Sequence, residues 1–137
     1  MLYYSIVFES IVFTRHSICC HEDEKESIVI LQNIPFETTD WSDVKPDRHE
    51  GETGYALWKV RQCGDIRVRV VEYSADYKAD HWCAKGHILY CLEGGITTHL
   101  KDGRVVELHK GMSYEVEDES YPHSSYSEHG AILFIVD

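Results

Sequence analysis

The alternation of apolar and polar positions predicts strands along most of the chain from residue 28 onward. Residues 66–73 place isoleucine and valines on one face and two arginines on the other, which is the two-residue period of a strand. Residues 55–60 form a second strand, and the Gln-Cys-Gly-Asp sequence that separates the two is typical of a hairpin turn. Residues 131–136 are almost wholly apolar, as expected of a strand that is buried on both faces.

The spacing of these strands predicts a sandwich or a barrel. Glycine-containing turns at residues 101–103 and 109–111 separate strands at intervals of roughly ten residues, and no stretch has a convincing helical period. Closure into a double-sheet jelly roll would protect the strand edges and enclose an interior cavity. The length of 137 residues, without a repeat or a low-complexity linker, favours a single domain with a sizeable core.

Residues 1–27 differ from this pattern. The apolar run at residues 2–8 is interrupted by Glu9 and no basic residue precedes it, so it fits neither a signal peptide nor a membrane span. We therefore expect an N-terminal extension over residues 1–27, either an added strand or a poorly ordered segment. The domain itself should occupy residues 28–137.

Charge and cysteine content narrow the class of partner and compartment. The chain carries 24 acidic and 13 basic side chains, and the net charge of -11 argues against nucleic acid or an anionic membrane surface as a partner. Five cysteines are an odd number, and without an export signal we interpret them as reduced thiols rather than a disulfide framework. These features predict a cytoplasmic protein.

The residues with coordinating chemistry concentrate in one short stretch. His81, Cys83 and His87 fall within seven residues. If residues 81–83 are extended, the side chains of His81 and Cys83 point to the same face. An Ala-Lys-Gly turn then returns His87 beside them. Imidazole and thiolate suit zinc, iron, nickel or copper and are poor ligands for calcium or magnesium. This His-x-Cys-x3-His spacing is a weak motif by itself.

Together with later residues, this stretch resembles the two short motifs of the cupin superfamily. The first family motif is His-x-His, three or four residues, Glu, six residues and Gly; the second is Gly, a strand, a Pro- or Gly-containing turn and His. On this resemblance His81 and Cys83 stand at the two His positions and His87 at the Glu position. The second motif runs from Gly111 to His123. Two of the four ligand positions therefore depart from the usual residue type.

Longer strings carry the resemblance to one group. Ala-Asp-His-Trp-Cys at residues 79–83, Lys-Gly-His-Ile at 85–88 and the closing Leu-Phe-Ile-Val-Asp are similar to the small uncharacterised group called DHCW-motif cupin-fold proteins. The resemblance runs from about residue 28 to the last residue. It implies an all-β double-stranded β-helix, the cupin jelly-roll barrel, paired as a homodimer. It implies no activity, because this fold hosts many functions.

The resemblance implies one divalent transition metal, iron, zinc or nickel, and the ligands would be His81, Cys83, His87 and His123. Three histidines that leave positions open for substrate or dioxygen, as in the thiol dioxygenases among cupins, would make the protein a small-molecule oxygenase. If Cys83 is a permanent fourth ligand, a closed zinc-type site would favour a non-catalytic binding or sensing protein. A metal-free structural protein is the third alternative.

Three residues are candidates for contact with a substrate. Arg69 can pair with a carboxylate through its guanidinium, although arginines at alternate strand positions more often form the solvated face of an edge strand. Alternation places Cys91 on the same side of its strand as His87, in a small apolar pocket. Tyr114 would offer a hydroxyl to that pocket, with core packing as the default. Trp82 should point away from the metal, into packing.

Overall fold

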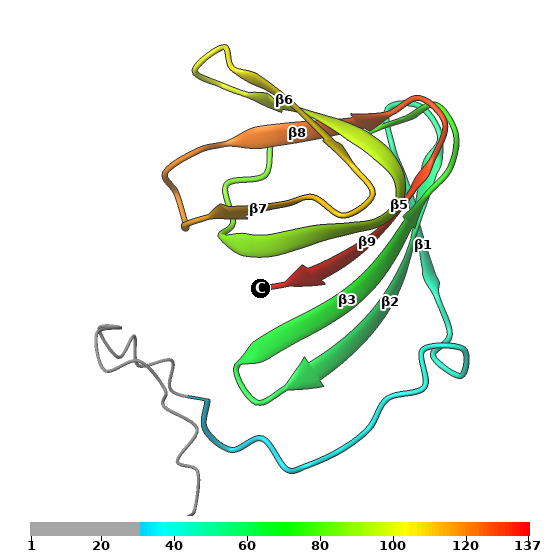
Figure 1. Cartoon of the computed structure of the whole chain (residues 1–137), viewed down its shortest axis with the longest axis vertical. Coiled ribbons are helices and arrows are strands. Elements are labelled where there is room, and N and C mark those ends of the chain that lie inside the picture. Colours follow the sequence, from blue (N-terminus) through cyan, green and yellow to red (C-terminus); the bar gives the residue numbers. More distant parts are fainter. Residues whose placement is uncertain (1–30) are drawn as a thin grey trace, which may run out of the picture. The chain divides into compact units, whose positions relative to one another are not determined.

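The structure is a computed structural model, and it describes residues 31–137. The predicted extension over residues 1–27 and most of the strand predicted at 28–31 lie outside the described residues. Nine strands form the described part, in agreement with the all-β prediction (Figure 1). They are β1 (Asp47–Glu50), β2 (Tyr55–Cys63), β3 (Ile66–Tyr73), β4 (Tyr77–Lys78), β5 (His87–Leu100), β6 (Val105–His109), β7 (Ser113–Val116), β8 (His123–Ser127) and β9 (Ala131–Val136). Within residues 31–137 there is no helix that could span a membrane.

Every strand pairing is antiparallel, and the hydrogen-bonded order is β1-β2-β3-β9-β5-β8-β4. Strands β6 and β7 pair with different stretches of β5. Two of the three predicted hairpins are confirmed, because Gly64 and Gly103 connect strands that pair with each other. The third prediction is wrong, because the turn at Gly111 connects β6 to β7, and these strands pair with β5 rather than with each other. The order shows that β9, the last strand in sequence, lies between β3 and β5 in the middle of the sheet.

Strand β5 is longer than its apolar run predicts, because it continues for 14 residues through Gly94 and Gly95. The register of its pairing with β9 shifts between Cys91 and Glu93, and Gly94 has a φ of 71°. A Cβ atom on Gly94 would collide with the carbonyl oxygen of Gly130, so only glycine fits this bend. Beyond the bend β5 leaves β7 and β9 and pairs with β6 and β8, which curls the sheet into a half-barrel (Figure 1).

Alternate residues of the central strands point inward and form the core. On β9, Leu133 and Ile135 are buried, whereas the intervening Phe134 is only half-buried. The prediction that this strand is buried on both faces is therefore only partly right. The complete buried apolar cluster is Ala56, Val71, Tyr77, Leu89, Cys91, Ile96, Leu108, Ala131, Leu133 and Ile135.

The interpretation of the β3 arginines as a solvated edge is wrong for Arg69. Strand β3 lies between β2 and β9, so it is not an edge strand, and Arg69 is only 6% exposed. Its Nη2 lies 2.5 Å from Oδ2 of Asp137, and its guanidinium carbon lies 4.5 Å from the centre of the Trp58 ring. Arg67 donates two further hydrogen bonds to the same carboxylate. The buried charge of Arg69 is thus compensated inside the fold, as a buried guanidinium requires.

Candidate metal centre

Three of the four predicted ligands come together in the structure. The coordinating atoms of Cys83, His87 and His123 all lie within 4.8 Å of one another. His87 begins β5 and His123 begins β8, and their ring centres are 4.9 Å apart. Cys83 forms an isolated β-bridge with His123, with backbone hydrogen bonds of 2.8 and 2.9 Å in the two directions. Backbone pairing therefore holds two of the three donors in register.

The loop between Cys83 and His87 is fixed by the turn that leads to His123. The backbone N–H of Gly86 donates to Oδ1 of Asp118 at 2.7 Å, and that of Glu119 donates to the carbonyl of Ala84 at 2.8 Å. A Cβ atom on Gly86 would come within 2.7 Å of the Asp118 backbone nitrogen, so a side chain would push the two loops apart. Close approach of the backbones explains why glycine precedes His87.

His87 has the state and the free atom that a metal ligand needs. Burial, together with the nearby His123 and Arg69, lowers its pKa to about 4, so the imidazole is neutral at physiological pH. Its Nε2 lies 3.1 Å from the hydroxyl of Tyr114. Its Nδ1 is buried and has no hydrogen-bond partner among residues 31–137. A neutral ring with one nitrogen held and the other unpaired fits a coordinating histidine.

The side chains of Cys83 and His123 are close enough to influence each other's protonation. Interaction with the His123 ring lowers the pKa of the Cys83 thiol, and interaction with Cys83 raises the pKa of His123. Nδ1 of His123 lies 2.9 Å from the carbonyl oxygen of Tyr121, so this nitrogen is the donor and Nε2 is left for the site. A thiolate and two imidazoles are a suitable donor set for a divalent transition metal, so the residues present fit such an ion.

This pairing predicts the pH dependence of Cys83 reactivity in metal-stripped protein. Because His123 holds the thiol pKa below its usual value, the reactive thiolate forms at lower pH than in an ordinary cysteine. We expect His123→Ala to move the iodoacetamide alkylation profile of Cys83 to higher pH. Mass spectrometry of the Cys83 peptide measures this, with Cys63 in the same digest as the internal control. An unchanged profile would show that His123 does not influence the Cys83 thiol.

His81, the fourth predicted ligand, is not part of this group. Residues 80 and 81 form a bend, so the rule that places His81 and Cys83 on one face of an extended strand does not apply there. The His81 side chain is 69% exposed, and its Nδ1 lies 2.5 Å from Oδ1 of Asp80. Ligation by His81 stays a prediction. Trp82 was expected to pack inside but is exposed, with the Lys101 amine 5.8 Å from its ring centre.

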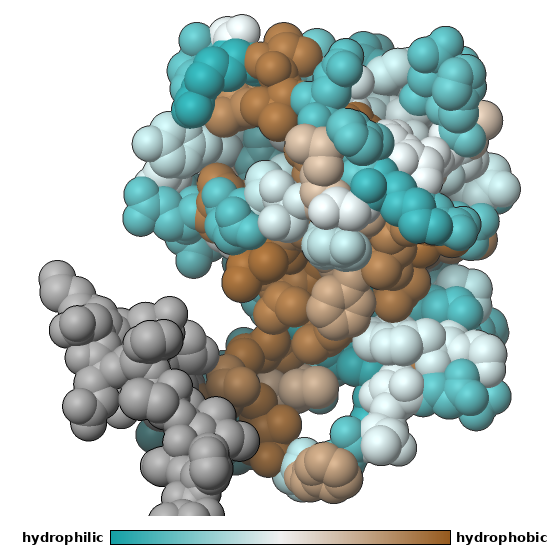
Figure 2. All heavy atoms as spheres, viewed as in Figure 1, coloured by the Kyte–Doolittle hydropathy of each residue, from teal (hydrophilic) through white to brown (hydrophobic). Residues whose placement is uncertain are grey.

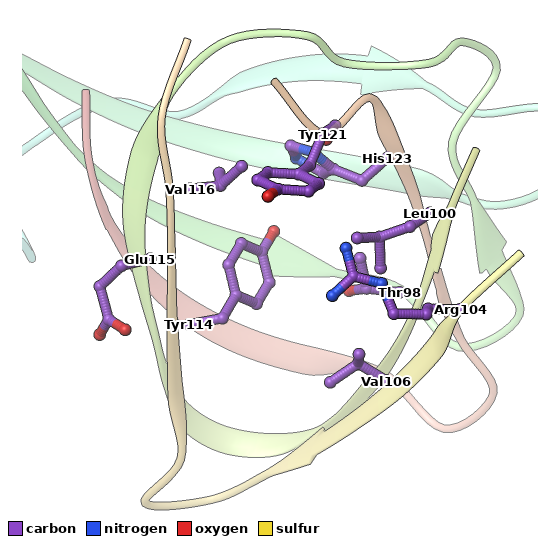
Figure 3. Close-up of a pocket in the computed structure, with 9 residues that line it drawn as sticks. All are labelled: Thr98, Leu100, Arg104, Val106, Tyr114, Glu115, Val116, Tyr121 and His123. Carbon is purple, nitrogen blue, oxygen red and sulfur yellow. The ribbon is translucent and has the colours of Figure 1, made fainter. Parts of the chain in front are cut away.

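A cavity of about 320 Å³ borders the group of three donors (Figure 3). His123 belongs both to the group of donors and to the cavity lining. Tyr114 lines the cavity and contacts His87 through its hydroxyl. Contact of Tyr114 with a substrate stays a prediction. The lining residues are Thr98, Leu100, Arg104, Val106, Tyr114, Glu115, Val116, Tyr121 and His123.

The other two candidate substrate residues lie away from this cavity. Arg69 is held by Asp137, and Cys91 is fully buried in the core with its thiol 3.4 Å from the carbonyl of Glu93. Sequence reasoning missed Arg104 and Thr98. Thr98 could have been identified from the two-residue alternation of its strand, which directs Thr98 and Leu100 inward.

Comparison with solved structures identifies the fold. Similar structures include a predicted oxalate decarboxylase from Thermotoga maritima, with 15% identity over 73% of this chain and 96% of that chain and a TM-score of 0.62. An RmlC-like cupin from Shewanella frigidimarina shares 15% identity over 75% and 90% of the two chains, with a TM-score of 0.61. Ectoine synthase from P. lautus shares 12% identity over 74% and 76%, also with a TM-score of 0.61.

The likeness lies in the fold rather than in the sequence. No family model matches the sequence, and no curated protein matches it. The similar structures nevertheless cover most of the described strands, and the jelly-roll prediction agrees with them. The chain therefore has the cupin fold, with a Cys83, His87 and His123 group that could hold a metal ion.

Proposed function

We propose that the protein is a metal-dependent cupin enzyme that acts on a small molecule bound in the cavity beside Cys83, His87 and His123. The observation that carries this proposal is that three metal donors meet at the border of a cavity and share His123 with it. Catalytic metal sites keep a coordination position open for water or substrate, and three protein ligands leave such a position. The resemblance to the cupin motifs supports the metal but not the activity, because Cys83, His87 and His123 stand at motif positions.

The metal would be a single divalent transition ion, and iron, zinc and nickel all accept this donor set. Such an ion supplies Lewis-acid chemistry, or redox chemistry in the case of iron. The residues of the chain would hold it and exclude part of the solvent, since His87 and His123 are buried. Two of the similar structures are named as enzymes, an ectoine synthase and a predicted oxalate decarboxylase, so this fold can support catalysis on small organic molecules.

A second candidate function is a binding or sensing protein with a closed zinc site. The observation that favours it is that His81 lies only two residues before Cys83, on an exposed bend. A rotation of this segment could add a fourth donor, and a Cys-His-His-His set around zinc is typical of a closed site. The two candidates differ in whether His81 is needed for the metal.

Metal analysis of His81→Ala and Cys83→Ser separates the two functions. The full chain, purified without an affinity metal, would be analysed by mass spectrometry for metal content. We expect near-stoichiometric metal in the wild type, little change in His81→Ala, and a clear loss in Cys83→Ser. Of these two substituted residues, only Cys83 belongs to the group of three donors. Equal loss in both variants would instead support the closed zinc site. Metal-free wild-type protein would contradict both.

We propose in addition that two copies pair through the outer face of the sheet. Ile88, Tyr90 and Leu92 point outward from β5 and are exposed, and Tyr90 pairs across the sheet with the half-buried Phe134 of β9. Apolar side chains (brown) gather over this part of the molecule in Figure 2. Trp41 covers one edge of Phe134, at 6.5 Å between ring centres. A second copy carries the same apolar surface, so a two-fold axis would bury both at once.

A Tyr90→Lys substitution tests this pairing. A lysine ammonium at the centre of the apolar surface would have to be desolvated on association, so we expect the variant to be monomeric. Size-exclusion chromatography with light scattering measures the molar mass of the full chain. Val105→Lys, on an exposed apolar position of β6, is the matched control and should leave the mass unchanged. A wild-type monomer would refute the proposed dimer.

A further inference from the structure

We propose that the cavity beside the metal centre binds a small carboxylate with an apolar body, held by Arg104, Tyr114 and Thr98. This inference names the class of molecule on which the proposed enzyme acts. The binding step can be tested separately from metal binding, because none of these three residues belongs to the group of donors.

The size and lining of the cavity select a small, largely apolar molecule. Its volume of about 320 Å³ lies at the lower end of the range for ligand pockets, roughly 300–1,000 Å³. Leu100, Val106 and Val116 supply aliphatic surface, and the rings of Tyr114 and Tyr121 supply aromatic surface. In Figure 3 these side chains surround a common space, and a short aryl or branched alkyl group would contact them on several sides.

Thr98 places an unpaired hydroxyl at this cavity. The residue is 3% exposed, and its Oγ1 makes no hydrogen bond of good geometry among residues 31–137; its polar neighbour is the Tyr114 hydroxyl. Buried hydroxyl groups are normally hydrogen-bonded, so one that lines a cavity without a partner points to a polar atom of a ligand. Valine would fill the same space without a hydroxyl, so packing alone does not explain threonine at this position.

Tyr114 adds a second hydroxyl to the cavity. Its oxygen lies 3.1 Å from Nε2 of His87, and a ring N–H there can donate to it. The phenolic hydrogen is then free to donate to something else. Because Tyr114 lines the cavity, an oxygen atom of a ligand there would accept that hydrogen bond.

Arg104 is the cationic side chain in the cavity lining; it is 59% exposed and forms an ion pair with Asp102. It follows the β5–β6 turn, and its guanidinium carbon lies 5.2 Å from the centre of the Tyr121 ring. Its hydrogen bonds to Asp102 use Nε and Nη2, so Nη1 has no partner within the described part of the chain. Figure 3 shows the guanidinium directed between Tyr114 and Leu100. Two free N–H groups on Nη1 can donate to a carboxylate oxygen.

The acidic residue at the cavity does not cancel this charge in the interior. Glu115 accepts a hydrogen bond from the Ser113 hydroxyl at 2.9 Å, and Figure 3 shows its carboxylate turned away from Arg104. The polar groups that line the space are the Arg104 guanidinium, the hydroxyls of Thr98, Tyr114 and Tyr121, and the His123 ring. The guanidinium and the hydroxyls can donate a hydrogen bond, which matches a carboxylate, since an ionised carboxylate only accepts.

Calorimetric titration with three probes of one shape tests this proposal. The probes are 3-phenylpropanoate, 3-phenylpropanamide and 3-phenylpropylamine, each added to the full chain with its metal bound. We expect the carboxylate to bind, the amide to bind at least about tenfold more weakly, and the amine to show no binding, because only the carboxylate accepts from all three donors. Equal affinities for carboxylate and amide, or no binding of the carboxylate, would overturn the inference.

Two variants identify the residues that bind the carboxylate. Arg104→Gln should weaken 3-phenylpropanoate binding by about tenfold or more and leave the amide unaffected, and Thr98→Val should weaken it severalfold. Arg48→Gln is the matched control, because Arg48 also pairs with an acid two residues away but lies outside the cavity. Full affinity in Arg104→Gln would overturn the assignment.

Metal content distinguishes failure of this inference from failure of the proposed enzyme. Arg104→Gln and Thr98→Val should retain the wild-type amount of metal, since neither residue is a donor. Carboxylate binding that disappears when the metal is removed, yet is insensitive to Arg104→Gln, would mean that the carboxylate binds the metal directly and would overturn the cavity site. Metal-free wild-type protein that still binds the carboxylate would contradict the proposed enzyme and leave the cavity site standing.

Discussion

His87→Ala is expected to remove most of the bound metal from the protein while its β-sheet circular dichroism is unchanged. The ring supplies a buried, neutral donor at the start of β5, and alanine has no donor atom. Loss of a residue that only supports a ligand typically lowers metal affinity by about 10–100-fold, and we expect loss of a ligand itself to have at least that effect. Metal analysis by mass spectrometry after extensive dialysis measures the change.

The control for this prediction is His99→Ala. His99 lies on the same strand but is exposed and outside the group of three donors, so its removal should leave the metal content at the wild-type level. Comparison of the two variants separates coordination from a general effect of removing an imidazole from β5. Undiminished metal in His87→Ala would remove this residue from the site and leave Cys83 and His123 as a pair.

Asp137→Ala is expected to lower the free energy of unfolding by about 3–5 kcal/mol, because it leaves the buried guanidinium of Arg69 without its partner. Burial by itself would raise the pKa of the Asp137 carboxyl, but the hydrogen bond from Arg67 and the charges of both arginines hold that pKa below its usual value. The carboxylate is therefore ionised throughout the physiological range. Urea denaturation followed by tryptophan fluorescence measures the difference.

The control for the buried pair is Glu50→Ala. Glu50 pairs with Arg48, and both side chains are largely exposed, so the loss of this pair should leave the denaturation midpoint near that of the wild type. A similar small change in Asp137→Ala would show that solvent reaches Arg69 in the folded protein. Both variants remove one carboxylate from an ion pair, so a difference between them reports the burial of the Arg69–Asp137 pair.

Local pattern was sufficient to predict several strands of this fold but not the short strands β1 and β4. Runs of β-forming residues predicted β2 and β9, and alternation predicted β3, all close to their observed bounds. The burial of Arg69 could not be predicted in the same way. It depends on which strands flank β3, and strand order is set by contacts between distant parts of the chain.

The metal site could be predicted in part for a similar reason. Cys83, His87 and His123 match motif positions that regular backbone pairing brings together. His81 required an extended backbone across residues 81–83, whereas Asp80 and His81 form a bend, and the ring of His81 contacts its neighbour in sequence instead. Irregular backbone of this kind has no clear periodic signal. The position of Arg104 in the cavity likewise depends on how the β5–β6 hairpin folds over the sheet.

The bend of β5 at Gly94 has a consequence for how this domain unfolds. One continuous strand is hydrogen-bonded to β7 and β9 before the bend and to β6 and β8 after it. Neither layer can open fully without releasing part of the other, so amide hydrogens in the two layers should exchange with solvent through one shared, cooperative opening. His87 at one end of the strand and Thr98 near the other would then become accessible in the same event.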